Sequence, residues 1–199
     1  MNAAIIVEGP DDVAVYQILV KRINRAIERI YARECLGRQK LKNKFVYLLG
    51  EFASNPHPFN LATAIVIRDS DCNDPQRIEQ ELQDIFVRLG QRMPFPVRFH
   101  ATKCKLECWL LADEQAINSV SMLRGGAGGI QPIAGDLESL READVIYRQT
   151  LSKAGLQDTG QVMREIAQRA RLERIAERCP RFRNFTQKIA GPPDAGVIR

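Results

Sequence analysis

Two acidic segments of this chain could carry chemistry, and each follows an apolar segment. Glu8 comes directly after the apolar residues 3–7. Asp69 and Asp71 come just after the apolar residues 64–67. Apolar runs of this kind are typical of buried parallel strands, whose carboxyl ends meet at one edge of a sheet. We therefore expect these carboxylates to converge there as oxygen ligands for Mg²⁺ or Mn²⁺, the ions of metal-assisted phosphoryl transfer.

Each of these acidic residues also has an ordinary structural explanation. Two aspartates in an exposed loop are common, so Asp69 and Asp71 alone do not specify a metal. In an extended backbone their spacing by two would place both side chains on one side, where like charges repel unless a cation holds them. A carboxylate that ends a buried strand, as Glu8 does, is rare unless it is paired or bound to a metal. The alternative for Glu8 is helix capping or an ion pair with a neighbouring arginine such as Arg68.

Apolar periodicity and turn residues predict the elements that position these acids. A long helix, capped by Asp11 or Asp12, is expected to run past Tyr31 and to end at Gly37 and the basic linker that follows. A second amphipathic helix should begin at Pro75 and reach about Leu89. The remaining expected elements are strands at 3–7, 45–49, 63–67 and 96–101, loops at 55–58 and 124–129, a short helix at 106–112, and helices from about 136 onward.

This alternation predicts an α/β fold, a mainly parallel sheet flanked by helices with a C-terminal helical extension. We expect residues 1–115 to form the core, 116–190 a helical extension packed on it, and 191–199 a flexible tail. The chain has 199 residues, of which 45% are hydrophobic, enough for a real core. Without an expected membrane span or secretion signal, the cytoplasm is the predicted location. The five cysteines are an odd number without a C-x-x-C pair, which predicts buried or incidental thiols.

The formal net charge of +5 is unevenly distributed. Residues 21–44 carry nine Lys or Arg and two Glu, and residues 164–188 carry eight and three. Basic flanks around an acidic centre suit a polyanionic substrate, and we expect Arg22, Arg25 and Arg29 to hold the backbone of DNA or RNA. The alternative is that these charges are solvated helix faces.

Two sequence blocks resemble a known family. Residues 7–12, a helix, and then residues 67–71 are similar to the Toprim signature, a Glu-Gly after the first strand and a D-x-D after the third. Topoisomerases, bacterial primases, recombination-repair proteins and overcoming-lysogenization-defect nucleases share that domain. Residues 105–113 resemble the E-x-W-L-L-A-D block of a bacterial Toprim-like family of unknown function that is related to those nucleases. Residues 179–185 resemble the ending of the same family, whose members are often encoded beside an ATPase of the structural-maintenance type.

The resemblance implies roles for individual residues. Glu8 would be a metal ligand or general base, and Lys103 or Lys105 would steady charge in the transition state. Asp11 and Asp12 stand where many relatives have a hydroxyl residue followed by an acid. The implied metal ligands are Glu8, Asp12, Asp69, Asp71 and Glu107, with Glu107 completing a second metal site. For Glu107, Trp109 and Asp113 the alternative is a helix docked on the sheet.

Other chemistries fit the sequence less well. A haloacid-dehalogenase phosphatase would carry its nucleophile where this chain has Glu8. His100, Cys104 and Cys108 recur every four residues, but a strand at 96–101 breaks a helical register and a fourth zinc ligand is not evident. Two histidines in the whole chain exclude paired-histidine nuclease chemistry, and the glycine-rich loop lacks the lysine of a P-loop.

These inferences converge on two functions. The first is a Mg²⁺- or Mn²⁺-dependent nuclease or nuclease subunit that works with a separately encoded ATPase, in defence or repair; the sequence leaves its oligomeric state open. The second is a non-catalytic Toprim-like module that binds nucleic acid or an ATPase partner.

Overall fold

Four parallel strands form the sheet of this computed structural model, which describes residues 1–90 and 92–191. Their order is β2-β1-β3-β4, and each neighbouring pair in the described ranges is parallel. The predicted α/β class with a mainly parallel sheet is therefore confirmed. The strands are β1 (Asn2–Val7), β2 (Arg29–Glu34), β3 (Leu61–Arg68) and β4 (Val97–Ala101).

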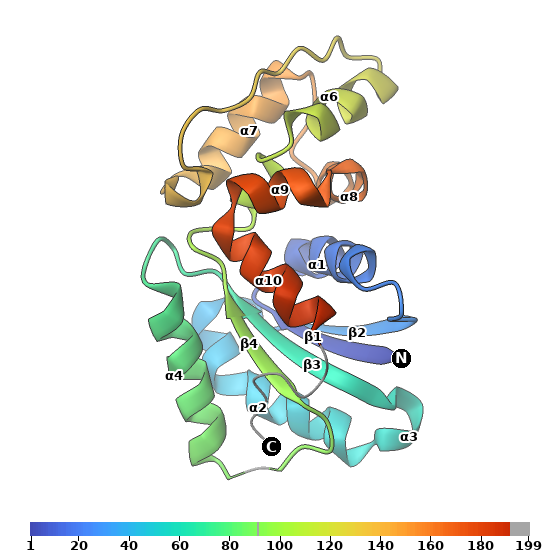
Figure 1. The fold of residues 1–199 in the computed structure, drawn as a ribbon, viewed down its shortest axis with the longest axis vertical. Helices are drawn as coiled ribbons and strands as arrows, with labels where there is room; N and C mark the ends of the chain where they lie inside the picture. Colours follow the sequence, from blue (N-terminus) through green and yellow to red (C-terminus); the bar gives the residue numbers. More distant parts are fainter. Residues whose placement is uncertain (91, 192–199) are drawn as a thin grey trace.

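The two central strands are buried on both faces, which explains their unbroken apolar sequences. Ile5 and Ile65 are paired and pack on one face, while Ile6 and Val66 pack on the other. Figure 1 shows helices on both sides of this sheet. The first face is covered by α1 (Pro10–Ile23) and α10 (Pro180–Ala190), and the second by α2 (Arg38–Ser54), the short α3 (Pro56–Phe59) and α4 (Pro75–Arg88).

The remaining helices continue the apolar core of the first face without a break. Trp109, Phe182 and Phe185 are almost fully buried there and contact one another through their rings. Helices α6 and α7 lie at the end of the molecule farthest from α2 (Figure 1). The elements are α5 (Glu107–Leu110), α6 (Glu114–Leu123), a 3₁₀ turn η1 (Leu137–Ser139), α7 (Ala143–Lys153), α8 (Gly160–Arg169) and α9 (Leu172–Arg178).

The long first helix predicted beyond Tyr31 is wrong. Helix α1 ends at Ile23, and Asn24 turns the chain by accepting a hydrogen bond from the Ala26 backbone. The residues that follow form the edge strand β2, where Ile30 and Ala32 pack against the core. Ile27, Ile30 and Tyr31 continue a helical spacing, whereas Ile30 and Ala32 share one face of a strand, and pairing with β1 decides between the two.

The strand predicted at 45–49 is also wrong, because those residues lie inside α2. The buried residues of that helix, Leu41, Phe45, Leu49 and Phe52, recur at three- and four-residue intervals. Tyr47, in the middle of the predicted strand, is 69% exposed. The expected loop at 55–58 overlaps α3.

Two of the five cysteines form a disulfide, which the sequence did not predict. Cys72 and Cys104 are bonded across 32 positions, so they are not incidental thiols. Cys35, Cys108 and Cys179 are free and buried, as expected. The predicted tail at 191–199 falls almost entirely outside the described residues. Among the described residues, no helix is both long and apolar enough to cross a membrane.

Candidate functional site

Glu8 lies at the carboxyl edge of the sheet, where β1 ends. Its Oε1 atom is 3.6 Å from Nε of Arg68, and its side chain is 19% exposed. The pKa of Glu8 is raised to about 7, mainly by burial; Arg68 opposes the shift, and the carboxylates of Asp71 and Asp12 add to it. The alternative explanation, an ion pair with Arg68, is thus present in the structure. It does not exclude a chemical role, since a carboxyl group that titrates near neutrality can exchange a proton.

Asp12 sits in the first turn of α1 and accepts a hydrogen bond from the backbone of Gly9 at 3.0 Å. This bond satisfies a free N–H at the start of the helix, so Asp12 has a structural role. Burial nevertheless raises its pKa to about 6, with Asp11 adding to the shift.

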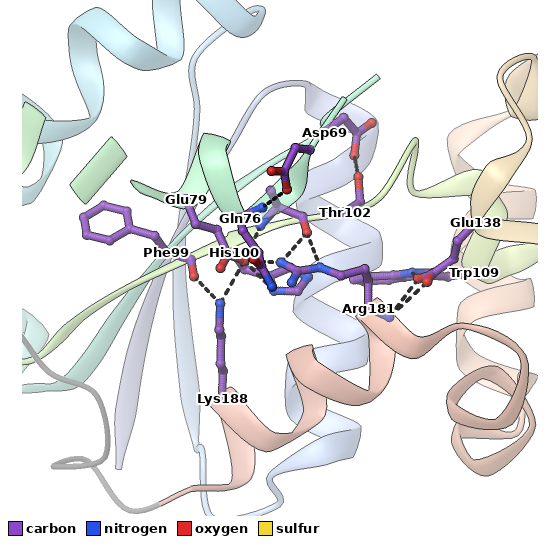
Figure 2. Close-up of polar contacts among 12 residues, drawn as sticks. Asp69, Gln76, Glu79, Phe99, His100, Thr102, Trp109, Glu138, Arg181 and Lys188 are labelled. Carbon is purple, nitrogen blue, oxygen red and sulfur yellow. Dashed lines mark hydrogen bonds and ion pairs between the residues drawn. The ribbon is translucent and has the colours of Figure 1, made fainter. Parts of the chain in front are cut away.

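Asp69 follows β3, beside β1 in the sheet, and is therefore on the same edge as Glu8. Its Oδ1 accepts a hydrogen bond from the hydroxyl of Thr102 at 2.9 Å, as Figure 2 shows. Burial raises the pKa of Asp69 well above its usual value, and the nearby carboxylates of Asp12, Glu107 and Glu8 raise it further. The structure therefore brings these four carboxylates close enough to influence one another.

Asp71 does not have the extended backbone from which its position beside Asp69 was expected. Its backbone is left-handed, with φ of 49°, and so is that of Cys72, with φ of 61°. The chain thus leaves the extended conformation immediately after Asp69. Asp71 turns instead toward α2, where its Oδ2 accepts a hydrogen bond from Arg38 at 2.9 Å.

Glu107 begins α5 and is close enough to Asp12 and Asp69 to interact with both. Burial raises its pKa, and Asp12 contributes to the shift. Trp109 and Asp113, from the same sequence block, are structural. Trp109 is fully buried and donates to Glu138 at 3.1 Å, while Asp113 pairs with Arg171 at 2.6 Å.

Both candidate catalytic lysines contact the helical extension. Lys103 Nζ donates to Asp136 at 3.0 Å and to Ser139 at 2.9 Å. Lys105 Nζ donates to Asp144 at 2.7 Å, and this bond raises the pKa of Lys105. In this arrangement the two ammonium groups hold the extension to the loop that follows β4.

The basic residues Arg22, Arg25 and Arg29 do not share one helix face. Arg22 is partly buried and donates to the backbone oxygen of Ala167 at the end of α8, at 2.6 Å. Arg25 is exposed and lines a groove of about 440 Å³ between α1 and α8, together with Lys21 and Arg22. Arg29 is exposed at the start of the edge strand β2.

Sequence reasoning named Arg68 only as a possible ion-pair partner of Glu8, and it missed Tyr16. Arg68, which is 5% exposed, joins Glu8 to Glu81 on α4. Tyr16 on α1 is buried, and its hydroxyl has no hydrogen-bond partner among the described residues. Burial raises the pKa of Tyr16 well above its usual value, and Asp69, Asp12 and neighbouring carboxylates add to the effect. The helical spacing of Tyr16 indicates only that it is buried.

The donor set fits a hard cation, but its present geometry does not complete a metal site. Among the described residues, no three His, Cys, Asp or Glu side chains are arranged to hold an ion. The available donors are nevertheless carboxylate oxygens, which Mg²⁺ and Mn²⁺ prefer. Oε1 of Glu8 is buried and accepts no hydrogen bond within the described ranges, so it has a free lone pair. Within the described residues, His100, Cys104 and Cys108 do not form a zinc site, because Cys104 is bonded to Cys72.

No family model matches the sequence, and no curated protein matches it. Two solved structures are similar over most of the chain. One is the C-terminal region of the OLD protein of Xanthomonas campestris pv. campestris, with 11% identity and a TM-score of 0.46, covering 94% of this chain and 96% of that one. The other is the C-terminal region of the OLD protein of Burkholderia pseudomallei, with 14% identity, the same TM-score and the same coverage.

Proposed function

We propose that this chain is a Mg²⁺- or Mn²⁺-dependent nuclease or nuclease subunit that cleaves phosphodiester bonds. The observation that carries the proposal is the cluster of Glu8, Asp12, Asp69 and Glu107, whose pKa values are all raised at one edge of the sheet. Four carboxylates that disfavour each other's ionisation form a site that a divalent cation would stabilise.

The residues can be assigned roles from their positions. The oxygen ligands would come from Glu8, Asp12, Asp69 and Glu107, with Asp71 joining them on release from Arg38. A bound divalent ion would supply an activated water and charge stabilisation for the phosphate. Glu8, with a pKa of about 7, is suited to accept a proton near neutral pH.

Lys103 and Lys105 would contribute positive charge beside a phosphate. Their ion pairs with Asp136 and Asp144 keep both ammonium groups at the loop after β4, where Lys105 also interacts with Glu107 and Asp71. In that position they reduce the repulsion between a polyanionic strand and the acidic cluster. We also propose that a separately encoded ATPase works with this chain.

The decisive experiment compares wild type with Glu8→Gln. The change removes a charge at nearly constant volume, so cleavage of single- and double-stranded DNA or RNA with Mn²⁺ should be lost while the fold remains. Glu34→Gln is the matched control, because Glu34 ends the neighbouring strand β2 and is exposed. The assay is run with and without an ATPase encoded beside the gene. Cleavage that survives in Glu8→Gln would contradict the proposal.

A second function is favoured by the same geometry. Glu8 pairs with Arg68, Asp12 accepts a bond from the Gly9 backbone and Asp71 pairs with Arg38, and such structural contacts suit a non-catalytic module that binds nucleic acid or an ATPase. If wild type cuts nothing under any of these conditions, and Glu8→Gln binds nucleic acid as wild type does, this second function is the better account.

A further inference from the structure

A pocket of about 500 Å³ lies beside the acidic cluster, between α2 and α4. Three cationic side chains line it: Lys42 from α2, Arg68 from the end of β3, and Arg77 from the first turns of α4. Two acidic residues, Asp74 and Glu81, line it as well. The pocket therefore carries a formal excess of one positive charge.

The cations of this pocket already hold one anion. The carboxylate of Glu81 accepts hydrogen bonds from both Lys42 and Arg68. Partial burial alone would raise the pKa of Glu81, but these two bonds lower it. Arg77 is exposed and makes no ion pair or hydrogen bond within the described ranges. Two donors thus converge on the place that Glu81 occupies, and a third is free beside them.

We propose that this pocket binds a phosphate group of the nucleic-acid backbone next to the phosphate that is cleaved, an inference that rests on the proposed function. Arginine and lysine donors in one concave site are the usual partners of phosphate oxygens. The pocket is coupled to the acidic cluster through Arg68, whose Nε lies 3.6 Å from Glu8. A phosphate here would therefore lie one guanidinium away from the proposed proton acceptor.

The lining also indicates what part of the substrate is recognised. No aromatic side chain is found among its lining residues, so the pocket offers no surface on which a base can stack. Phosphate contacts position a strand without reading its sequence. The recognition proposed here is therefore independent of base sequence and equal for DNA and RNA.

Glu81→Gln gives the sharpest test, because it removes the competing carboxylate charge and leaves Lys42 and Arg68 in place. Binding of a single-stranded oligothymidylate and of inorganic phosphate is measured without divalent metal. Glu81→Gln should bind both about three- to tenfold more tightly, and Arg77→Ala about three- to tenfold more weakly. Arg88→Ala is the matched control, since Arg88 lies at the far end of α4 and donates to its own helix.

Unchanged binding in both Glu81→Gln and Arg77→Ala, or no binding by wild type to either probe, would overturn the pocket assignment. Arg77 is exposed, so its replacement by Ala should leave the packing of the core unchanged. The outcome is separable from the fate of the nuclease proposal. Cleavage that depends on Glu8 but not on Arg77 would support the nuclease proposal and refute the phosphate pocket. Binding that depends on Arg77 without any cleavage would support the phosphate pocket and refute the nuclease proposal.

Discussion

Nε of Arg68 and Oε1 of Glu8 lie 3.6 Å apart, and neither atom makes a hydrogen bond within the described residues. The guanidinium and carboxyl groups therefore lie close together, and both side chains are largely buried. Arg68 lowers the pKa of Glu8, but burial outweighs it, and the carboxyl group titrates near pH 7. The protonation state of Glu8 is thus the property of the cluster most open to measurement.

Stability should fall as Glu8 ionises. Its pKa is about 7 in the folded chain against 4.5 unfolded, so between these values the folded chain holds a proton that the unfolded chain has lost. The free energy of unfolding then decreases as the pH rises through this window. Glu8→Gln has no such proton, so relative to wild type it should gain about 1–3 kcal/mol between pH 4.5 and pH 8. Denaturant unfolding at several pH values measures the difference, which Glu34→Gln should not show.

Metal binding should tighten as the pH rises. A divalent ion needs ionised carboxylates, and the pKa values of Glu8 and Asp12 are about 7 and 6. Between about pH 6 and pH 8 the Mn²⁺ affinity should rise about tenfold, as one proton is released from Glu8. Calorimetry on wild type and on Asp69→Asn tests this, with Asp84→Asn on the exposed side of α4 as the control. Equal Mn²⁺ binding by all three proteins would refute the site.

The three arginines predicted to hold nucleic acid should behave differently from one another. Arg22→Ala removes the bond to the Ala167 oxygen and should lower stability by about 1–3 kcal/mol. Arg25→Ala and Arg29→Ala, both at exposed positions, should leave the thermal midpoint unchanged but weaken oligonucleotide binding. The slope of log K against log salt should decrease by about 1 for each replaced arginine that binds a phosphate in wild type. Binding titrations at several salt concentrations would show it. If the double variant Arg25→Ala/Arg29→Ala keeps the wild-type slope of log K against log salt, these arginines do not bind the nucleic-acid backbone.

The disulfide between Cys72 and Cys104 should stabilise the chain by about 3–4 kcal/mol, because it closes a loop of 32 positions in the unfolded state. Thiol titration of the unfolded, unreduced protein should find only Cys35, Cys108 and Cys179 reactive. Reductant should expose all five thiols and lower the thermal midpoint. The variant Cys72→Ser/Cys104→Ser should show the lower midpoint and no response to reductant. Five reactive thiols before reduction would contradict the bond.

The sequence predicted those elements whose hydrophobic pattern is compatible with only one secondary structure. Residues 3–7 and 63–67 are apolar almost throughout and are followed by acids, which suits a strand buried on both faces that ends at a polar edge. Pro75 and the apolar period after it define α4 for the same reason. From these elements alone, Glu8 and Asp69 could be placed on one edge.

The errors arose where local pattern does not decide. Ile27, Ile30 and Tyr31 continue the helical pattern of the preceding residues, Ile30 and Ala32 suit a strand, and only pairing with β1 selects the strand. Residues 45–49 form a five-residue apolar run, and their helical period becomes visible only when Leu41 and Phe52 are included. The turn at Asp71 and the bond from Cys72 to Cys104 depend on loops that meet in space, which no periodicity encodes.

The outer edge of β4 has consequences beyond the site. Phe99 and Ala101 point their backbone carbonyls away from β3, and these accept hydrogen bonds from Lys188 at 2.7 Å and from Arg181 at 2.9 and 3.1 Å. The Ala101 amide donates to Glu79 at 2.9 Å, and Figure 2 shows this network between α4, β4 and α10. An open strand edge is a template on which another chain can add. Here side chains from α4 and α10 occupy the groups that such a strand would need, so these helices protect the β4 edge from pairing with another chain.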